Sequence, residues 1–221
     1  MPASRTTAYI APFVVFLVFL AIRSNLPVDP GLEYPLRVIV VTATLLAVSR
    51  GVLGFRLSNP VGSLLLGAAV FLLWIGPDLI WPGYRSHWLF ANLLTGPASA
   101  SPPPTARSDA FFLVFRILGA AVLVPIVEEL FWRGWLMRWL IDKDFERVPL
   151  GTYQPFSFWI TAVLFASEHG SFWGVGLLAG VAYNWWMLRT RNLADCVLAH
   201  AVTNACLAGY VLSSGRWEYW G

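Results

Sequence analysis

Long apolar segments recur along most of the 221-residue chain and limit what it can fold into. A bilayer core is about 30 Å thick, and a helix needs about 20 mostly apolar residues to cross it. Segments near this length, separated by clusters of charged and turn residues, predict about eight transmembrane helices. The expected fold is therefore an all-α polytopic membrane protein, built as a bundle of these helices.

The composition agrees with this class. Hydrophobic residues make up 57% of the chain and charged residues only 12%, whereas soluble domains carry about 25% charged residues. The net charge of +3 is too small to indicate a nucleic-acid partner. The bilayer itself is the expected partner.

A run of proline and small polar residues, residues 95–109, divides the chain. Three consecutive prolines cannot continue a helix, so we expect a loop there. Residues 1–94 then form amino-terminal transmembrane helices, and residues 110–221 form the helices with candidate chemistry, within one membrane domain. Arg37 and Arg116 lie near the ends of their segments, where we expect long side chains to reach the membrane surface.

Basic residues predict the orientation. If the helices alternate in direction from a cytoplasmic amino terminus, that side collects Arg5, Arg50, Arg56, Arg138, Lys143, Arg147, Arg189 and Arg191. The opposite side collects Arg23, Arg85, Arg107 and Arg216. Loops rich in Lys and Arg remain in the cytoplasm, so we expect an integral membrane protein with a cytoplasmic amino terminus.

Strongly polar residues lie deep in the last apolar segments, where such groups are rare and usually functional. They are Glu128, Glu129, Arg133, Glu168, His169, Asn184, His200 and Asn204. On a helix, Glu129 and Arg133 share a face and can pair, while Glu128 lies about 100° away. His200 and Asn204 share a face in the same way.

The position of Glu128 along its helix decides whether it can meet His169. If that helix ended just after the glutamates, the two residues would lie near opposite membrane surfaces. A continuous helix from about Asp109 to Ile141, about 50 Å long, places Glu128 near the middle of the membrane. We therefore expect one long helix there.

These residue types suit hydrolysis of an amide or an ester. A carboxylate beside a histidine can hold and deprotonate water, which contributes about 10²–10⁴ in rate. A histidine N–H and an asparagine NH₂ one turn apart can stabilise the resulting oxyanion, and one such donor contributes about 10²–10³. The pattern favours Glu128 as the base, with no cofactor.

Other interpretations remain open. One Glu and two His form a known zinc ligand set, although the chain has no HExxH sequence and Asn204 is a poor zinc ligand. The polar residues also suit a non-enzymatic scaffold or immunity-type protein, with Glu129 and Arg133 as a structural ion pair and Asn184 as an interhelical hydrogen bond. A small transporter with a carboxylate proton relay is a third candidate.

Three short motifs carry a resemblance to a known family. EELFWR (Glu128 to Arg133), FASEH (Phe165 to His169) and HAVTN (His200 to Asn204) follow one another in a polytopic chain. In this order they resemble the EExxxR, FxxxH and HxxxN motifs of the CAAX-protease and bacteriocin-processing family of intramembrane proteases.

The resemblance implies a bundle of about eight helices with a polar intramembrane cavity. It implies that Glu128 and His169 activate water and that His200 and Asn204 form the oxyanion hole, with Glu129 and Arg133 in support. Two further segments, EYPLR and WIGPDLIWPG, are similar to the bacterial branch associated with exosortase sorting systems. That similarity implies a bacterial inner (plasma) membrane and a peptide or protein substrate cleaved close to the membrane, such as an anchored sorting tail.

Overall fold

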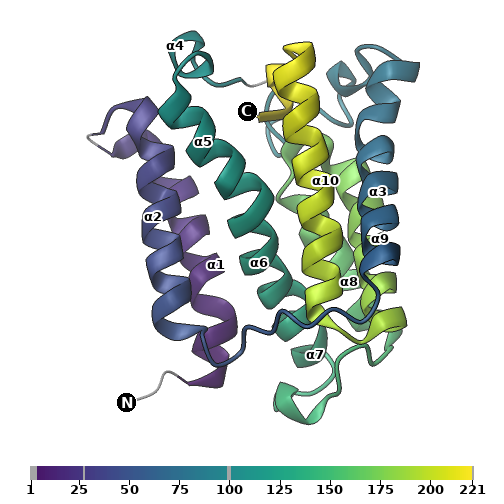
Figure 1. Ribbon diagram of the computed structural model, residues 1–221. Helices are drawn as coiled ribbons and strands as arrows, with labels where there is room; N and C mark the ends of the chain where they lie inside the picture. The colour runs from purple at the N-terminus through teal and green to yellow at the C-terminus, as the bar shows by residue number, and fades with distance from the viewer. Residues whose placement is uncertain (1–3, 27, 99–100, 221) are drawn as a thin grey trace.

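The structure, a computed structural model, describes residues 4–26, 28–98 and 101–220. Within these ranges the ordered elements are helices, without a strand, and the long helices form an upright bundle (Figure 1). Five helices are long and apolar enough to cross a membrane, namely Arg5–Ile22, Gly31–Val48, Pro60–Ile80, Ala110–Trp139 and Leu193–Ser214. This confirms the expected all-α polytopic class.

Three long helices make up the amino-terminal part: α1 (Arg5–Ile22), α2 (Pro30–Val48) and α3 (Pro60–Ile80). Each begins after a residue whose side chain accepts a hydrogen bond from a free backbone N–H of the first turn. These capping residues are Ser4, Asp29 and Asn59. Such caps satisfy donors that a helix start leaves without partners.

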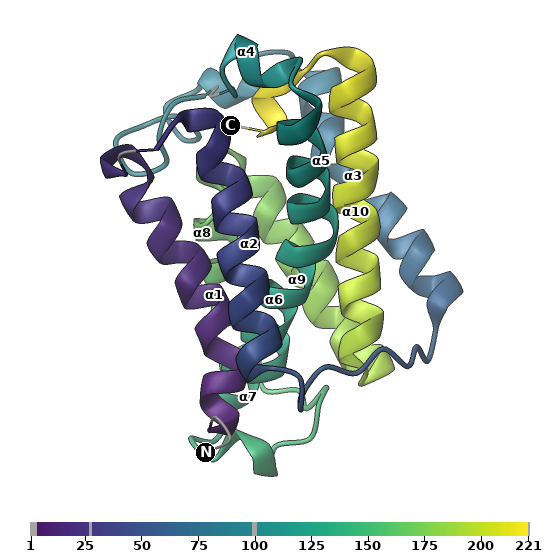
Figure 2. The same cartoon turned by 60° about the vertical axis from the view of Figure 1, so that its left-hand side comes forward.

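One long helical rod follows. It comprises α5 (Ala110–Leu118), the π-helical segment η3 (Gly119–Leu123), α6 (Val124–Glu129), the π-helical segment η4 (Leu130–Leu136) and α7 (Met137–Trp139). The expected continuous helix is therefore present, and at 1.5 Å per residue it is about 45 Å long. The rod lies between α2 and α10 (Figures 1 and 2).

The carboxyl-terminal part consists of α8 (Pro155–Ser167), η6 (Gly170–Phe172), α9 (Trp173–Thr190), α10 (Leu193–Ser214) and η7 (Trp217–Trp220). In it, α8 packs against α9, and α10 packs against α3. Shorter helical turns lie in the connections: η1 (Arg23–Asn25), η2 (Tyr84–Ser86), α4 (Pro104–Arg107) and η5 (Phe145–Arg147).

The proline-rich segment differs from the expected loop. Residues 104–107 form the one-turn helix α4, which begins at Pro104. Proline is accepted at the first helical position because its missing N–H would have no partner there and its φ angle already suits a helix. The prolines therefore mark the start of a turn of helix.

Arg37 was expected to reach the membrane surface, and this expectation was wrong. Its side chain is buried, with only 4% of the residue exposed, and its guanidinium lies 4.7 Å from the ring centre of Tyr34. Arg116 also turns inward, and its Nη2 donates to the Trp220 carbonyl over 2.9 Å. Both cations therefore contact an aromatic face, and Arg116 also contacts a backbone carbonyl, within the protein.

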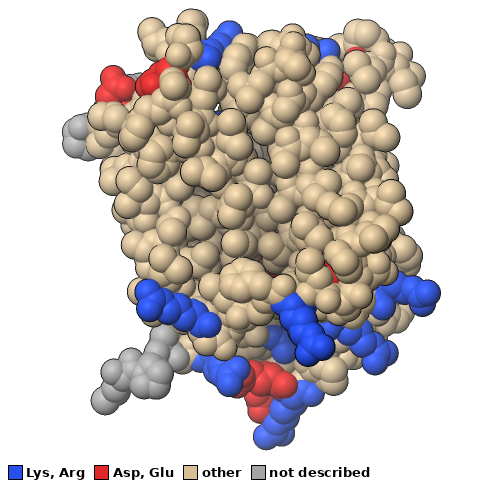
Figure 3. All heavy atoms as spheres, viewed as in Figure 1, with Lys and Arg blue, Asp and Glu red and all other residues tan. Residues whose placement is uncertain are grey.

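Charged side chains gather at the two ends of the bundle, with a broad band of other residues between them (Figure 3). Large apolar side chains of the long helices are exposed, including Leu65 on α3 and Val114 on α5. At the end nearest the amino terminus most of the visible charges are basic (Figure 3). This distribution suits a protein whose middle lies in hydrocarbon.

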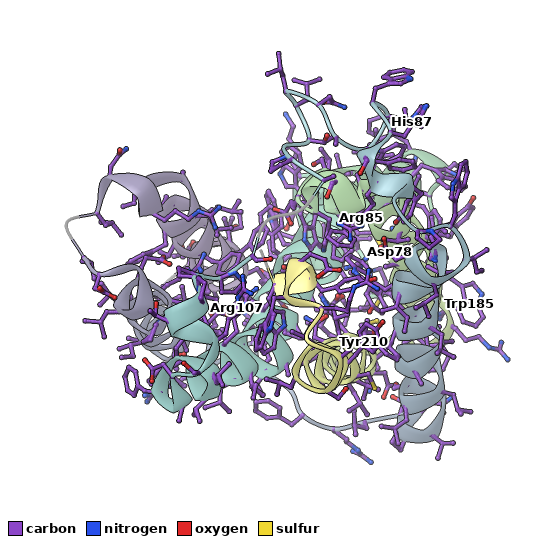
Figure 4. The ribbon with its side chains drawn as sticks, turned by 90° about the horizontal axis from the view of Figure 1, so that it is seen from above. Asp78, Arg85, His87, Arg107, Trp185 and Tyr210 are labelled. Carbon is purple, nitrogen blue, oxygen red and sulfur yellow. The ribbon has the colours of Figure 1, made fainter. Side chains whose placement is uncertain are left out.

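Polar contacts tie together the opposite end of the bundle, where Asp78 and Arg85 lie close to each other (Figure 4). Arg85 Nε donates to Asp78 Oδ1 over 3.1 Å, and the Tyr219 hydroxyl donates to Asp78 Oδ2 over 2.7 Å. Since Asp78 belongs to α3 and Tyr219 to η7, these bonds fasten the last turn of the chain to the bundle.

A glycine allows α3 and α10 to approach closely. A Cβ atom at Gly67 would lie 2.4 Å from the Ala199 carbonyl oxygen and 2.7 Å from the Val202 Cβ. Both distances are shorter than real contacts allow. Because Ala199 directly precedes His200, this contact fixes the part of α10 that carries the candidate site.

We expect Gly67→Ala to destabilise the protein by about 1–3 kcal/mol, because the added methyl group overpacks the α3–α10 contact. Gly76→Ala on the same helix is the matched control, since no heavy atom lies within 4 Å of its added Cβ. Alanine favours helix over glycine, so the control should be neutral or slightly stabilising. Unfolding of the purified proteins in detergent measures both changes, and equal stabilities would contradict the close contact.

Candidate active site

A buried ion pair forms the centre of the candidate site. Arg133 Nη1 donates to Glu129 Oε1 over 2.9 Å, and both side chains are fully buried. His200 Nδ1 lies 3.0 Å from the same oxygen, although it is 71 residues away in sequence. With Glu129 ionised, its carboxylate only accepts hydrogen bonds, so Nδ1 of His200 carries a hydrogen and donates it. The pairing that the spacing of Glu129 and Arg133 predicts is present.

The remaining donors of Arg133 are held by α9. Its Nε donates to Asn184 Oδ1 over 2.9 Å, and its Nη2 donates to the Gly180 carbonyl over 3.2 Å. Asn184 in turn donates from Nδ2 to the Phe158 carbonyl on α8 over 2.8 Å. The guanidinium also lies 4.7 Å from the ring centre of Phe165. Partners on three sides therefore fix this cation in one orientation.

Small residues bring α9 close to α8. Gly176, Gly180 and Asn184 repeat every four residues and so follow one side of the helix. A Cβ at Gly180 would lie 3.1 Å from the Ala162 carbonyl oxygen, and one at Gly176 would lie 3.3 Å from the ring of His169. The interhelical role expected for Asn184 is present, and this four-residue repeat is the sequence signal that marks its side of α9.

A tyrosine fixes the ring of His200. The rings of Tyr183 and His200 are stacked, with centres 5.0 Å apart and planes at 22°. The Tyr183 hydroxyl donates to Thr203 Oγ1 over 2.7 Å, and Thr203 Oγ1 donates to the Gly67 carbonyl over 2.9 Å. Sequence reasoning did not find Tyr183, because an aromatic residue in an apolar helix gives no separate signal.

His169 lies just beyond the end of α8. Its Nδ1 lies 2.8 Å from the Phe165 carbonyl oxygen, which can only accept, so Nδ1 carries the hydrogen. In the neutral ring the lone pair is then on Nε2. The ring packs against those of Phe165 and Trp74, with centres 4.7 Å and 5.1 Å away. This tautomer leaves Nε2 able to accept a proton.

Glu128 is buried but less engaged than its neighbour Glu129. Within the described residues its Oε2 has no hydrogen-bond partner, and the same holds for Glu129 Oε2, Trp132 Nε1 and Thr161 Oγ1. No hydrogen bond between Glu128 and His169 is present in the described part of the chain. The site therefore contains a buried carboxylate oxygen that can accept a hydrogen bond from water or substrate.

Asn204 contacts the first π-helical segment of the rod. Its Nδ2 donates to the Ala120 carbonyl over 2.8 Å. An amide nitrogen carries two hydrogens, so one remains for another acceptor. His200 and Asn204 share a face of α10, as their spacing predicts, but each also bonds to a different part of the rod. Glu168, the C-cap of α8, is exposed.

An apolar groove of about 280 Å³ is lined by residues of the rod, of α10 and of the connection after α2. Ile126 and Leu130 line it from the rod, on either side of Glu128 and Glu129 in sequence. Val197 and Ala201 line it from α10, on either side of His200. The groove thus follows the two helices that carry the buried polar side chains.

The described residues contain no group of three or more His, Cys, Asp or Glu side chains with the proximity needed to hold a metal ion. The oxygen of Glu129 that faces His200 is occupied by hydrogen bonds from Arg133 and His200 itself.

Taken together, these features define a polytopic helical membrane protein with a buried polar site between its rod, α9 and α10. Residues 110–206 match a family model described as Type II CAAX prenyl endopeptidase Rce1-like. This match, which covers less than half of the 221-residue chain, agrees with the resemblance to the CAAX-protease family and with the hydrolase and membrane-protease class. Neither a search of curated proteins nor one of solved structures gave a match.

We expect Asn184→Ala to destabilise the protein by about 1–3 kcal/mol, because it leaves the charged Arg133 Nε buried without a partner and removes the bond to the Phe158 carbonyl on α8. Asn25→Ala, at an exposed asparagine in η1, is the control and should change the free energy of unfolding by less than about 0.5 kcal/mol. Unfolding in detergent measures both. A neutral Asn184→Ala would mean that α9 does not hold Arg133.

Proposed function

We propose that the protein is an intramembrane glutamic endopeptidase that hydrolyses a peptide bond of a membrane-associated substrate. The observation that carries this proposal is that two adjacent buried glutamates differ in their hydrogen-bond partners. Glu129 is held through Oε1 by Arg133 and His200, whereas Glu128 makes no hydrogen bond within the described residues; the buried Oε2 of each glutamate has no partner there. The family match of residues 110–206 supports the protease class.

In the proposed mechanism, Glu128 and His169 activate a water molecule. A carboxylate oxygen accepts one hydrogen of the water, and Nε2 of His169 accepts the other. Proton transfer to Glu128 makes the water a hydroxide-like nucleophile that attacks the carbonyl carbon of the substrate. Glu128 then returns the proton to the leaving amine, so the carboxylate is restored at the end of the cycle.

His200 and Asn204 would stabilise the oxyanion that this attack creates. Since Nδ1 of His200 donates to Glu129, the ring must also be protonated on Nε2 to donate to the oxyanion. The Glu129 carboxylate accepts from Nδ1 and so orients the ring, and Arg133 holds that carboxylate in place. The second hydrogen of Asn204 Nδ2 supplies the other donor.

The apolar groove beside the site suggests how a substrate arrives. Its lining of aliphatic residues from the rod and α10 suits a membrane-embedded peptide segment. An anchored sorting tail of an exosortase-type system is the substrate that the amino-terminal motifs favour. The predominance of basic residues at the end nearest the amino terminus supports a cytoplasmic amino terminus in a bacterial inner membrane (Figure 3).

We expect Glu128→Gln and His200→Ala each to abolish cleavage of a fluorogenic peptide library by the purified protein in nanodiscs, while thermal unfolding shows both variants folded. The control is Glu146→Gln, at an exposed loop glutamate paired with Arg5, which should cleave like the wild type. The wild type should also keep its activity in the presence of a chelator.

Results other than these would indicate a different function or mechanism. Loss of cleavage with chelator and its recovery with zinc would move the mechanism to a metal. Full activity in both site variants would refute the residue assignment. A wild type that cleaves no peptide, and whose cellular role survives Glu128→Gln, would favour a scaffold.

We expect Asn204→Ala to lower kcat by about 10²-fold with little change in KM, because an oxyanion donor acts mainly in the transition state. Steady-state kinetics measures this, and the melting temperature reports the separate loss of the bond to Ala120. A variant with raised KM and unchanged kcat would place Asn204 in substrate binding instead.

A further inference from the structure

Two guanidinium groups share one aromatic ring between α2 and α5. Arg37 Cζ lies 4.7 Å and Arg116 Cζ lies 4.6 Å from the ring centre of Tyr34. Outer rings extend the arrangement, because Arg37 also lies 5.4 Å from Phe16 and Arg116 lies 5.6 Å from Trp220. We call these five residues the arginine ladder. It joins α1, α2, α5 and η7.

The ladder has more positive charge than negative partners. Glu33 Oε2 lies 3.5 Å from Arg37 Nη2, which leaves two guanidinium groups with one carboxylate. Within the described residues, the buried Nε and Nη1 of Arg37 and the buried Nε of Arg116 have no hydrogen-bond acceptor. Charged donors without acceptors are costly inside a protein. An anion that accepts from both arginines would satisfy them.

Glu33 adds a second requirement. Its Oε1 is buried and has no hydrogen-bond donor among the described residues. A ligand that fits the whole cluster therefore carries an anionic group for Arg37 and Arg116 and a hydrogen-bond donor for Glu33. A phosphate ester with an ammonium or hydroxyl group a few bonds away has this combination, and the headgroups of phosphatidylethanolamine and phosphatidylglycerol are examples.

The depth of the ladder agrees with a lipid headgroup. Arg37 is seven residues from the start of α2, and Arg116 is six residues from the start of α5. At 1.5 Å per residue, both lie about 9–11 Å below the helix ends, close to the boundary between headgroups and hydrocarbon. Leu36 and Val114, next to the ladder in sequence, are exposed on the outer surface of the bundle.

The ladder is also separate from the candidate active site. Arg116 precedes Glu128 by twelve residues of the same rod, about 18 Å along its axis. We propose that Arg37 and Arg116, together with Glu33, bind the headgroup of a phospholipid through its phosphate and a neighbouring ammonium or hydroxyl donor. This site does not depend on the proposed protease mechanism.

The test is native mass spectrometry of the full chain in a maltoside detergent, titrated with lipids of identical acyl chains. Phosphatidylethanolamine or phosphatidylglycerol should bind at least about tenfold more tightly than phosphatidylcholine. The quaternary ammonium of phosphatidylcholine has no N–H and cannot donate a hydrogen bond to Glu33. Inorganic phosphate forms a separate arm. Binding of phosphate alone as tightly as the lipid would overturn a lipid ligand in favour of a soluble phosphate.

Amino-acid substitutions test whether the lipid binds at the arginine ladder. Arg37→Gln and Arg116→Gln should each weaken lipid binding at least about tenfold, whereas Arg107→Gln should not, although Arg107 lies at the same end of the bundle. Glu33→Leu should remove the preference over phosphatidylcholine while binding persists. Equal binding of all three lipids by the wild type would overturn the proposal, and this comparison needs no variant to fold.

Discussion

The buried pair of Glu129 and Arg133 is the interaction on which the rest of the site depends. Two charges inside an apolar bundle are tolerated only when the geometry is good and further hydrogen bonds satisfy both groups. Asn184 and Gly180 on α9 accept from the Arg133 cation, and His200 on α10 bonds to Glu129 Oε1, while the buried Glu129 Oε2 has no partner among the described residues. The pair therefore fixes the relative positions of three helices, and a shift of any one would leave a buried charge uncompensated.

This pair also gives its neighbour a different environment. Glu128 precedes Glu129 by one residue, so the helix turns it by about 100° away from Arg133. It remains buried, and one of its oxygens has no partner among the described residues. Helix geometry alone thus gives two chemically identical side chains different surroundings. One glutamate can then react with substrate while the other holds the neighbouring side chains in position.

Sequence patterns were sufficient where contacts are local. The four-residue spacing predicted the Glu129–Arg133 pair, and the requirement that Glu128 lie near His169 predicted the continuous rod. The bond from His200 to Glu129 could not be predicted, because nothing in one sequence reports a contact across 71 residues. The predicted position of the Arg37 side chain was wrong for a related reason. Its partners include Phe16 on another helix, and hydropathy alone favoured the membrane surface.

The two π-helical segments, η3 and η4, determine the direction around the helix axis in which the side chains between them point. One residue more or fewer in a helix turns everything beyond it by about 100°. A single-residue deletion within residues 119–123 would therefore rotate both glutamates away from α9 and α10. Insertions and deletions can be accommodated in the connecting loops but not in this stretch of the rod. The number of residues there is therefore as strictly constrained as the identity of the charged residues that follow.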